Sequence, residues 1–130
     1  MWLLRTAKRV RAGRALQRGR YTCVRGYQHM LANMATDLYA CRQMILATAR
    51  LADAGQDIRT EASMCKLFVS QACFRVADQA MQIHGNVGVT KNHPVEFIFR
   101  RLRLYRIVTG TSEIQRNTIA KGILRPREAA

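Results

Sequence analysis

Apolar residues recur every three or four positions along two long stretches of the chain, residues 27–54 and 60–84. In the first stretch they are Tyr27, Met30, Leu31, Met34, Leu38, Cys41, Met44, Ile45 and Leu51. In the second stretch they are Met64, Cys65, Phe68, Val69, Ala72, Cys73, Val76, Ala80 and Ile83. This spacing gives a helix one apolar stripe. The sequence therefore predicts two long helices that pack antiparallel across a short loop.

Glycine residues and capping residues mark the ends of these helices. Gly55 follows the last periodic residue of the first stretch, where helices commonly end. Asp57 or Thr60 is the candidate cap of the second helix, and Gly85 and Gly88 mark its end. No stretch shows strand-like alternation, an internal repeat or low complexity, so the sequence predicts an all-α fold.

Two shorter helices are predicted further along, over residues 94–105 and 112–124. Pro94 suits the first turn of a helix, because its missing N–H group would have no partner there. Ser112, followed three residues later by Gln115, predicts a capping box at the start of the last helix. Two helix starts so close in sequence predict two sets of free backbone N–H groups that lie near each other and face a ligand.

The basic charge of the chain is unevenly distributed. The chain carries 22 Lys and Arg residues against 8 Asp and Glu residues, a formal net charge of +14. Residues 1–26 hold eight of these basic residues and no acidic one. Three interpretations stay open for this segment: an amphipathic mitochondrial-type presequence, a basic arm for nucleic acid or an anionic membrane, or the product of a truncated or displaced reading frame. We therefore treat residues 1–26 separately from the domain that follows.

The four cysteines show no CxxC spacing, and the three histidines are scattered. Cys65 and Cys73 would lie about 12 Å apart along one helix, too far for a disulfide. The sequence therefore predicts reduced thiols that serve as small apolar fillers and no metal site. No apolar run approaches the roughly 20 residues that cross a bilayer, so no membrane span is expected.

An ordered series of motifs occupies residues 82–120. It comprises Gln82-Ile83-His84-Gly85, Gly88, Pro94-Val95-Glu96, Arg103, Arg106, Gly110-Thr111-Ser112-Glu113-Ile114, Arg116 and Ile119-Ala120. In order and spacing the series resembles the C-terminal helical domain of the acyl-CoA dehydrogenase family of flavoenzymes. The resemblance continues more loosely back to about Gln28 and covers about the last third of a family member. It implies an up-down helical bundle over residues 27–130.

The resemblance implies two contacts with FAD and one with the substrate. By position, the turn formed by Gln82, Ile83, His84, Gly85 and Asn86 lies against the ADP portion of FAD, usually the FAD of a neighbouring subunit. Asn86 stands where the family usually has a second glycine, but asparagine tolerates left-handed geometry, so we expect the turn to survive. The implied second FAD contact is Thr111, Ser112 and Glu113, with Gly110 beside the substrate. Without the resemblance, each turn would be an ordinary helix cap.

The implied reaction is α,β-dehydrogenation of acyl-CoA thioesters, in which a base takes the α-proton and flavin N5 takes the β-hydride. Many family members hold the catalytic glutamate immediately before the Gly-Thr pair, where this chain has Thr109. A hydroxyl alone is not a usable base, so no catalytic residue is assigned. We expect Glu96 and Glu113 to pair with Arg100, Arg116 or helix caps instead.

The resemblance also implies partners and a location. It implies an acyl-CoA substrate, an electron-transfer flavoprotein-type acceptor and a homotetramer built as a dimer of dimers. Nucleic acid is not among the implied partners. The location would be the cytoplasm in a bacterium or the mitochondrial matrix in a eukaryote. Family members also have an N-terminal helical domain and a middle β-domain, so we expect this chain alone to be incomplete for catalysis. Two alternatives stay open: a non-catalytic assembly module of sister subunits, and a small basic helical nucleic-acid binder.

Overall fold

The computed structural model describes residues 25–124, which form four α-helices, one 3-10 helix and no strand. The elements are α2 (Arg25–Asp53), α3 (Arg59–His84), η1 (Gly85–Val89), α4 (Pro94–Leu104) and α5 (Ser112–Leu124). The predicted all-α fold is confirmed, and each helix begins and ends within two residues of its predicted bounds. The greater part of the basic segment, Cys23 and the residues after 124 lie outside the described residues.

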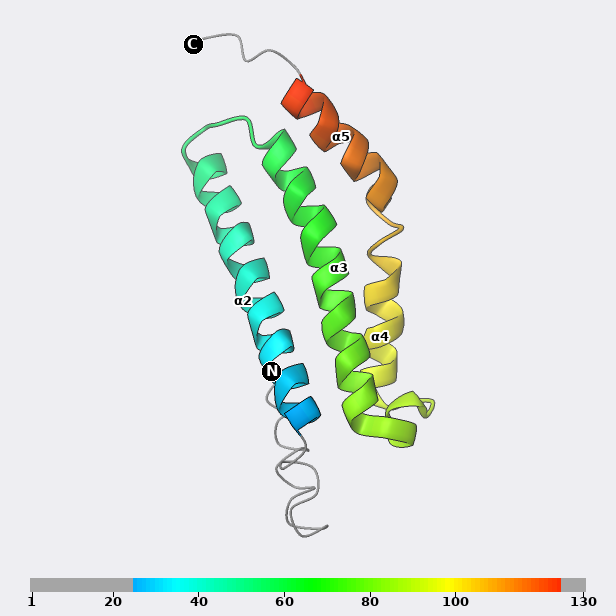
Figure 1. Cartoon of the computed structure of the whole chain (residues 1–130). Helices are drawn as coiled ribbons and strands as arrows, with labels where there is room; N and C mark the ends of the chain where they lie inside the picture. Colours follow the sequence, from blue (N-terminus) through cyan, green and yellow to red (C-terminus); the bar gives the residue numbers. More distant parts are fainter. Residues whose placement is uncertain (1–24, 125–130) are drawn as a thin grey trace.

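Helix α3 is the central element of the fold (Figure 1). It packs against α2 on one side and against both α4 and α5 on the other. Helices α4 and α5 follow each other along α3 and both run opposite to it, as α2 does (Figure 1). Because α2 makes no such packing contact with α4 or α5, the described part of the chain is a layer one helix thick on either side of α3.

The core of this layer is small and lies at one end of the molecule. Its buried members are Met34 of α2, Ala80 and Ile83 of α3, and Val95 of α4. Half-buried side chains pack around them: Tyr27, Met30, Leu31, Val76 and Met81. The first three turns of α2, the last turns of α3 and the first turn of α4 therefore contribute to the core at this end, next to the turn that follows α3.

The ends of the two long helices follow the predicted turn chemistry in part. Gly55 has a φ of 74°, a left-handed conformation that glycine adopts without steric cost. Neither of the two candidate caps occupies the cap position of α3, which is Ile58. Asp57 lies one residue earlier, and its Oδ1 accepts a hydrogen bond of 3.1 Å from the Arg59 backbone N–H. Pro94 is the first residue of α4, as predicted, and the His93 side chain accepts from the Val95 N–H at 3.3 Å.

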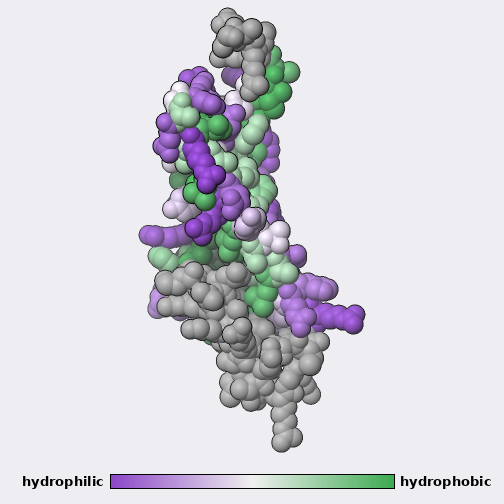
Figure 2. Space-filling view, turned by 90° about the vertical axis from the view of Figure 1, so that its left-hand side faces the viewer, coloured by the Kyte–Doolittle hydropathy of each residue, from purple (hydrophilic) through white to green (hydrophobic). Residues whose placement is uncertain are grey.

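Large apolar side chains remain exposed on both flanks. On the α2 flank, Figure 2 shows hydrophobic residues interspersed with hydrophilic ones, and Tyr39, Ile45 and Leu46 are exposed there. On the α4–α5 flank the exposed apolar residues include Phe97, Leu104, Tyr105, Ile107 and Ile114. Soluble monomers seldom expose so many large apolar side chains together, and such surfaces commonly meet another chain or domain.

Candidate functional site

The turn after α3, which we call the Gly85 turn and define as residues 82–89, is open on its outer side. Gly85 has φ 61° and ψ −146°, and its backbone N–H donates to the carbonyls of the preceding helical turn. A Cβ placed on Gly85 would meet no atom within 4 Å. The flanking Gln82 and Asn86 are exposed. A ligand can therefore approach the main chain closely at Gly85.

The inner side of the same turn is tightly packed. Ile83 and His84 are each 8% exposed. The His84 Nδ1 lies 2.7 Å from the Ala80 carbonyl oxygen, which can only accept, so Nδ1 carries the proton. A Cβ on Gly88 would lie 2.8 Å from the His84 Cβ and 3.0 Å from the Met81 carbonyl oxygen. Of the five predicted residues, Gln82, Gly85 and Asn86 thus face outward, whereas the side chains of Ile83 and His84 fix the turn from within.

The structure also shows why Asn86 is compatible with the turn. The only non-glycine residues of the described chain with positive φ are Asn92 and Thr109, so Asn86 does not adopt the left-handed conformation. It lies in η1, where its carbonyl accepts a hydrogen bond of 3.2 Å from the Thr90 hydroxyl. The backbone therefore does not require glycine at this position.

The turn between α4 and α5, which we call the Gly110 turn and define as residues 109–113, has a different construction. Two successive residues, Thr109 with φ 56° and Gly110 with φ 89°, are left-handed. This conformation is unusual for a β-branched residue such as threonine. The Thr109 hydroxyl donates to the Val108 carbonyl at 2.7 Å, and the Gln115 side chain donates to the Thr109 carbonyl at 3.3 Å. Gln115 therefore closes the turn from the helix that follows.

The predicted capping box at Ser112 is wrong by one residue. The cap is Thr111, whose hydroxyl accepts from the Ile114 N–H at 3.4 Å and whose carbonyl accepts from the Gln115 N–H at 3.0 Å. Ser112 is the first helical residue, because the two left-handed residues turn the chain one position earlier than the sequence pattern suggests. Gln115 bonds a carbonyl oxygen and not the N–H group that a capping box requires.

Two buried polar atoms near the Gly110 turn have no hydrogen-bond partner among residues 25–124. Ser112 is 5% exposed and its hydroxyl oxygen is unpartnered. The Nε of Arg106 is also buried and unpartnered, while the guanidinium lies 5.9 Å from the centre of the Phe74 ring. Arg106 belongs to the motif series of the sequence, but sequence reasoning missed this contact because Phe74 is distant in sequence. Buried polar atoms are normally hydrogen-bonded, so these two mark an incomplete site.

Glu113 adds a negative charge to the Gly110 turn. Its side chain is 75% exposed and lies 3.7 Å from Arg116. Hydrogen bonds from its own backbone N–H and from the Thr111 hydroxyl hold the pKa of the carboxyl below its ordinary value, and Arg116 and Arg106 lower it further. The predicted pairing of Glu113 with Arg116 is confirmed, as is that of Glu96 with Arg100 at 2.6 Å. Both acids therefore have structural partners.

The structure does not bring the two turns together. They lie at opposite ends of α4 (Figure 1), whose 11 residues span about 16 Å at 1.5 Å per residue. The prediction that the starts of α4 and α5 lie near each other is wrong, because α4 itself separates them. Each turn can therefore meet a different part of one extended ligand, or a different ligand.

Residues 25–124 contain neither a candidate membrane span nor a cluster of metal ligands. No helix there is long and apolar enough to cross a bilayer. Within the same range, no three or more His, Cys, Asp or Glu side chains cluster as metal ligands do.

The family model described as acyl-CoA dehydrogenase, C-terminal domain, matches residues 3–124. The chain belongs to the acyl-CoA dehydrogenase family. The match includes both turns, and it begins well upstream of Gln28, where the motifs of the resemblance become recognisable.

Relatives of this acyl-CoA dehydrogenase domain include mitochondrial and bacterial proteins. It is 43% identical over 98 residues to the short/branched chain specific acyl-CoA dehydrogenase, mitochondrial, of Rattus norvegicus, covering 75% of this chain and 23% of that protein. It is 37% identical over 102 residues to acryloyl-CoA reductase (NADH) of Anaerotignum propionicum, covering 78% of this chain and 26% of that protein. The chain thus spans about a quarter of the length of these curated relatives.

Solved structures share the fold of this acyl-CoA dehydrogenase domain. The acyl-CoA dehydrogenase from Geobacillus kaustophilus superimposes with a TM-score of 0.72 at 32% identity, covering 75% of this chain and 26% of that chain. A chain from the structure of the electron transferring flavoprotein of Acidaminococcus fermentans superimposes with a TM-score of 0.82 at 30% identity, covering 93% and 32%. The predicted C-terminal helical bundle of the family is therefore confirmed.

Proposed function

We propose that this chain serves as the C-terminal helical domain of an FAD-dependent oxidoreductase that dehydrogenates acyl-CoA thioesters. Its own contribution is to contact FAD through the two turns and to hold subunits together. The observation that carries the proposal is the Gly85 turn, where the main chain is open to a ligand within a motif series of the family. One structural neighbour of the domain, a chain 20% identical, comes from an FAD complex, and that neighbour supports the fold alone.

The residues of the Gly85 turn fit the pyrophosphate of FAD. Residues 82–89 contain no acidic side chain, and glycine lets phosphate oxygens approach the main chain. The exposed amide side chains of Gln82 and Asn86 can both donate hydrogen bonds. We therefore assign the diphosphate to this turn.

The Gly110 turn fits hydroxyl groups better than phosphates. The first N–H groups of α5 already have partners within the turn, since the Ser112 N–H donates to the Arg106 carbonyl and the Ile114 N–H to the Thr111 hydroxyl. The ionised Glu113 carboxylate also repels an anion nearby. Glu113 instead accepts from a ribose or ribityl hydroxyl, and the unpartnered Ser112 hydroxyl supplies a further bond. The bound FAD supplies the hydride acceptor of the reaction, while this turn orients it and excludes water from it.

Proton removal is not assigned to the Gly110 turn. The Thr109 hydroxyl donates its hydrogen bond to the Val108 carbonyl at 2.7 Å. Threonine also does not ionise near neutral pH. Gly110, beside it, is part of the same proposal as a residue next to the substrate, and a Cβ there would meet the Gln115 side chain. We therefore assign the general base to a residue outside this turn.

The exposed apolar side chains of both flanks support assembly with other subunits. We propose a homo-oligomer, a dimer of dimers, in which the flank formed by Phe97, Leu104, Tyr105 and Ile107 is covered. An electron-transfer flavoprotein-type acceptor and a mitochondrial-matrix or bacterial cytoplasmic location follow from the relatives and are part of the same proposal.

A matched pair of variants tests the Gly85 turn. Gly85 and Gly55 both have positive φ, and a Cβ on either meets no atom within 4 Å. Gly85→Val and Gly55→Val therefore carry a similar backbone strain but lie at opposite ends of the bundle. We expect the dissociation constant for FAD to rise about tenfold or more in Gly85→Val, equivalent to about 1.4 kcal/mol, and to stay near wild type in Gly55→Val. The measurement is an FAD titration followed by size exclusion with visible spectra. Equal losses in both variants, or a wild-type protein that retains no FAD, would contradict the proposal.

The second candidate function is a non-catalytic assembly module, which Thr109 in place of the family glutamate favours. Mixing the chain with a catalytically active sister subunit discriminates the two. An assembly module enters the hetero-oligomer without FAD at its own turns, whereas the proposed domain adds bound FAD in proportion to its copies. A nucleic-acid role is not proposed, since α4 arginines pair with Glu96 or stack on Phe97 at 4.7 Å.

A further inference from the structure

The interface between α2 and α3 holds two thiols that touch each other. Cys41 of α2 is 4% exposed, and Cys73 of α3 is partly buried. A hydrogen bond joins the two side chains, and neither residue is in a disulfide. Neither thiol lies in the Gly85 turn or the Gly110 turn, so the proposed function leaves the pair without a role.

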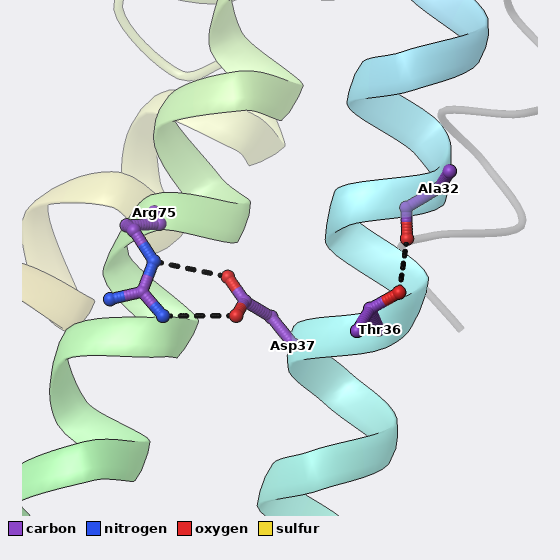
Figure 3. Close-up of polar contacts among 4 residues, drawn as sticks. All are labelled: Ala32, Thr36, Asp37 and Arg75. Carbon is purple, nitrogen blue, oxygen red and sulfur yellow. Dashed lines mark hydrogen bonds and ion pairs between the residues drawn. The ribbon is translucent and has the colours of Figure 1, made fainter.

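Neighbouring contacts confirm that the two thiols face each other across an antiparallel pair of helices. Asp37 and Arg75 form a two-bond ion pair at 2.9 and 3.1 Å (Figure 3). Further along, the Thr48 hydroxyl lies 3.0 Å from the Cys65 sulfur. As the α2 partner advances from 37 through 41 to 48, the α3 partner falls from 75 through 73 to 65. Cys41 and Cys73 are therefore in register, between two other contacting pairs.

A disulfide fits this register without a change of fold. Packed helices have axes roughly 8–10 Å apart and carry their Cα atoms at a radius of about 2.3 Å. Facing Cα atoms therefore approach to about 3.4–5.4 Å, which overlaps the range of about 4.4–6.8 Å that disulfides occupy. Buried Ser70, Ala72 and Ala77 of α3 are small, which allows close packing around Cys73.

We propose that Cys41 and Cys73 form a two-thiol oxidation site, which hydrogen peroxide converts to an intrachain disulfide that joins α2 to α3. The site is a property of this chain and does not rest on FAD binding.

The two thiols have different roles in this reaction. Cys73 is the more accessible, and the hydrogen bond from Cys41 stabilises its thiolate. The Cys73 thiolate attacks one peroxide oxygen, the O–O bond breaks, and hydroxide leaves and is protonated to water. The Cys41 sulfur then attacks the sulfenic sulfur of Cys73, the S–O bond breaks, and a second water leaves with the Cys41 proton. Two thiols lose two electrons, and the peroxide is reduced to two waters.

Burial of the two thiols makes their oxidation slow. It raises the pKa of Cys41 to about 11 and also raises that of Cys73. The charged groups that face the pair are Asp37, whose carboxylate raises both pKa values, and Arg75, which lowers that of Cys41. The thiolate fraction near neutral pH is therefore small, and oxidation of the pair depends on the sulfenic acid being captured at once by the thiol beside it.

Peptide mapping of the peroxide-treated full chain tests the proposal directly. Trypsin places the four cysteines on four different peptides, residues 21–25, 26–42, 60–66 and 67–75. The reduced protein is treated with hydrogen peroxide, the remaining thiols are alkylated, and the digest is analysed by mass spectrometry without reduction. We expect peptide 26–42 linked to peptide 67–75, with the protein lighter by two hydrogens. At about 10 μM protein this link should exceed links between chains on the order of a hundredfold, because tethered groups have millimolar or higher effective concentrations.

Serine variants provide the controls. Cys41→Ser and Cys73→Ser should lose the link, whereas Cys65→Ser should keep it, because Cys65 contacts Thr48 and not a second thiol. Oxidation should also raise the Tm of wild type and Cys65→Ser but not that of Cys41→Ser. The proposal is overturned if Cys73 remains alkylatable after Cys65 has been oxidised, or if it links mainly to Cys65 or Cys23. Over-oxidation of Cys73 to sulfinic acid at the same rate in wild type and Cys41→Ser would also overturn it.

Discussion

The Gly85 turn and the Gly110 turn each precede a short helix, but they differ in which residue is left-handed and in how the buried groups beside it are packed. In the Gly85 turn, the single left-handed residue is a glycine, and His84 and Gly88 pack against each other beneath it. In the Gly110 turn, a threonine adopts the left-handed conformation. Next to it, the hydroxyl of Ser112 is buried without a partner. The Gly85 turn is therefore well packed on its inner side, whereas the Gly110 turn leaves a buried hydroxyl without a partner among the described residues.

This difference separates stability from ligand binding. A turn that is satisfied on its inner side and open on its outer side can bind a ligand without changing shape. A turn with a strained residue and an unpartnered buried hydroxyl gains hydrogen bonds only when something else supplies them, since both features cost free energy in the free chain. We therefore expect mutations in the Gly85 turn to destabilise the fold, and mutations of Thr109 and Ser112 in the Gly110 turn to spare it or even stabilise it.

The largest effect is expected for Gly88→Ala. The added Cβ would lie 2.8 Å from the His84 Cβ and 3.0 Å from the Met81 carbonyl oxygen, and neither atom belongs to a flexible side-chain end. Overpacking of this kind costs about 1–3 kcal/mol, and we expect the upper part of that range in the free energy of unfolding measured with urea. Gly85→Ala is the control. Its added Cβ would meet no atom within 4 Å, so its cost is that of the left-handed backbone alone, about 1–2 kcal/mol. Equal losses in the two variants would mean that the inner packing of the turn contributes nothing.

A pair of serine variants tests the unpartnered hydroxyl. Ser112→Ala removes a buried hydroxyl that has no bond in the chain, so its unfolding free energy should stay level or rise by about 1 kcal/mol. Ser70→Ala, equally buried, loses a hydrogen bond to the Leu67 carbonyl and should cost about 1 kcal/mol. FAD affinity should fall in Ser112→Ala alone. A loss of stability as large as that of Ser70→Ala would show that the Ser112 hydroxyl already has a partner, such as water, in the free protein.

The sequence predicted the course of the backbone more fully than the contacts between helices. Helix bounds depend on periodicity, Gly85 and Pro94, which are local signals, and the structure confirms them. The capping box was misplaced because Ser112 and Gln115 have the right spacing, and only the two left-handed residues before them shift the cap to Thr111. A local motif gives the type of a helix start but not its register.

Contacts between helices escaped prediction for a different reason. The spacing of cysteines along the chain excluded a Cys65–Cys73 bond correctly, but it carried no information on which residue of α3 faces Cys41. That pairing depends on the register of two helices, which is set by the loop between them and by packing along their whole length. The stacking of Arg106 on Phe74 and the separation of the two turns by α4 are of the same kind.

A smaller effect is expected from relief of strain at Thr109. Thr109→Gly replaces a β-branched residue at φ 56° with the one residue that accepts this conformation freely. The strain released should outweigh the greater entropy of glycine in the unfolded chain, for a net gain of up to about 1 kcal/mol. Thr118→Gly, in the middle of α5, should instead cost about 0.5–1 kcal/mol. Thermal unfolding measures both, and a lower Tm for Thr109→Gly would show that the threonine methyl and hydroxyl hold the turn.

The smallest effect concerns the charge at the start of α5. Glu113 has a pKa below its ordinary value of 4.5 because its own backbone N–H and the Thr111 hydroxyl bond the ionised carboxylate. A carboxyl whose pKa is lower in the folded state stabilises the fold at pH values above 4.5, and this contribution is lost as the pH falls through the folded-state pKa. In Glu113→Gln the free energy of unfolding should therefore fall less steeply as the pH falls into the acid range. The part of the decline that comes from other groups should not change. Because the carboxylate is exposed, water competes for the same bonds and keeps the effect small. In the Gly85 turn, where residues 82–89 include no acid, the matched variant Gln82→Glu should not reproduce this pH dependence. If it does, the hydrogen bonds of the Gly110 turn are not its cause.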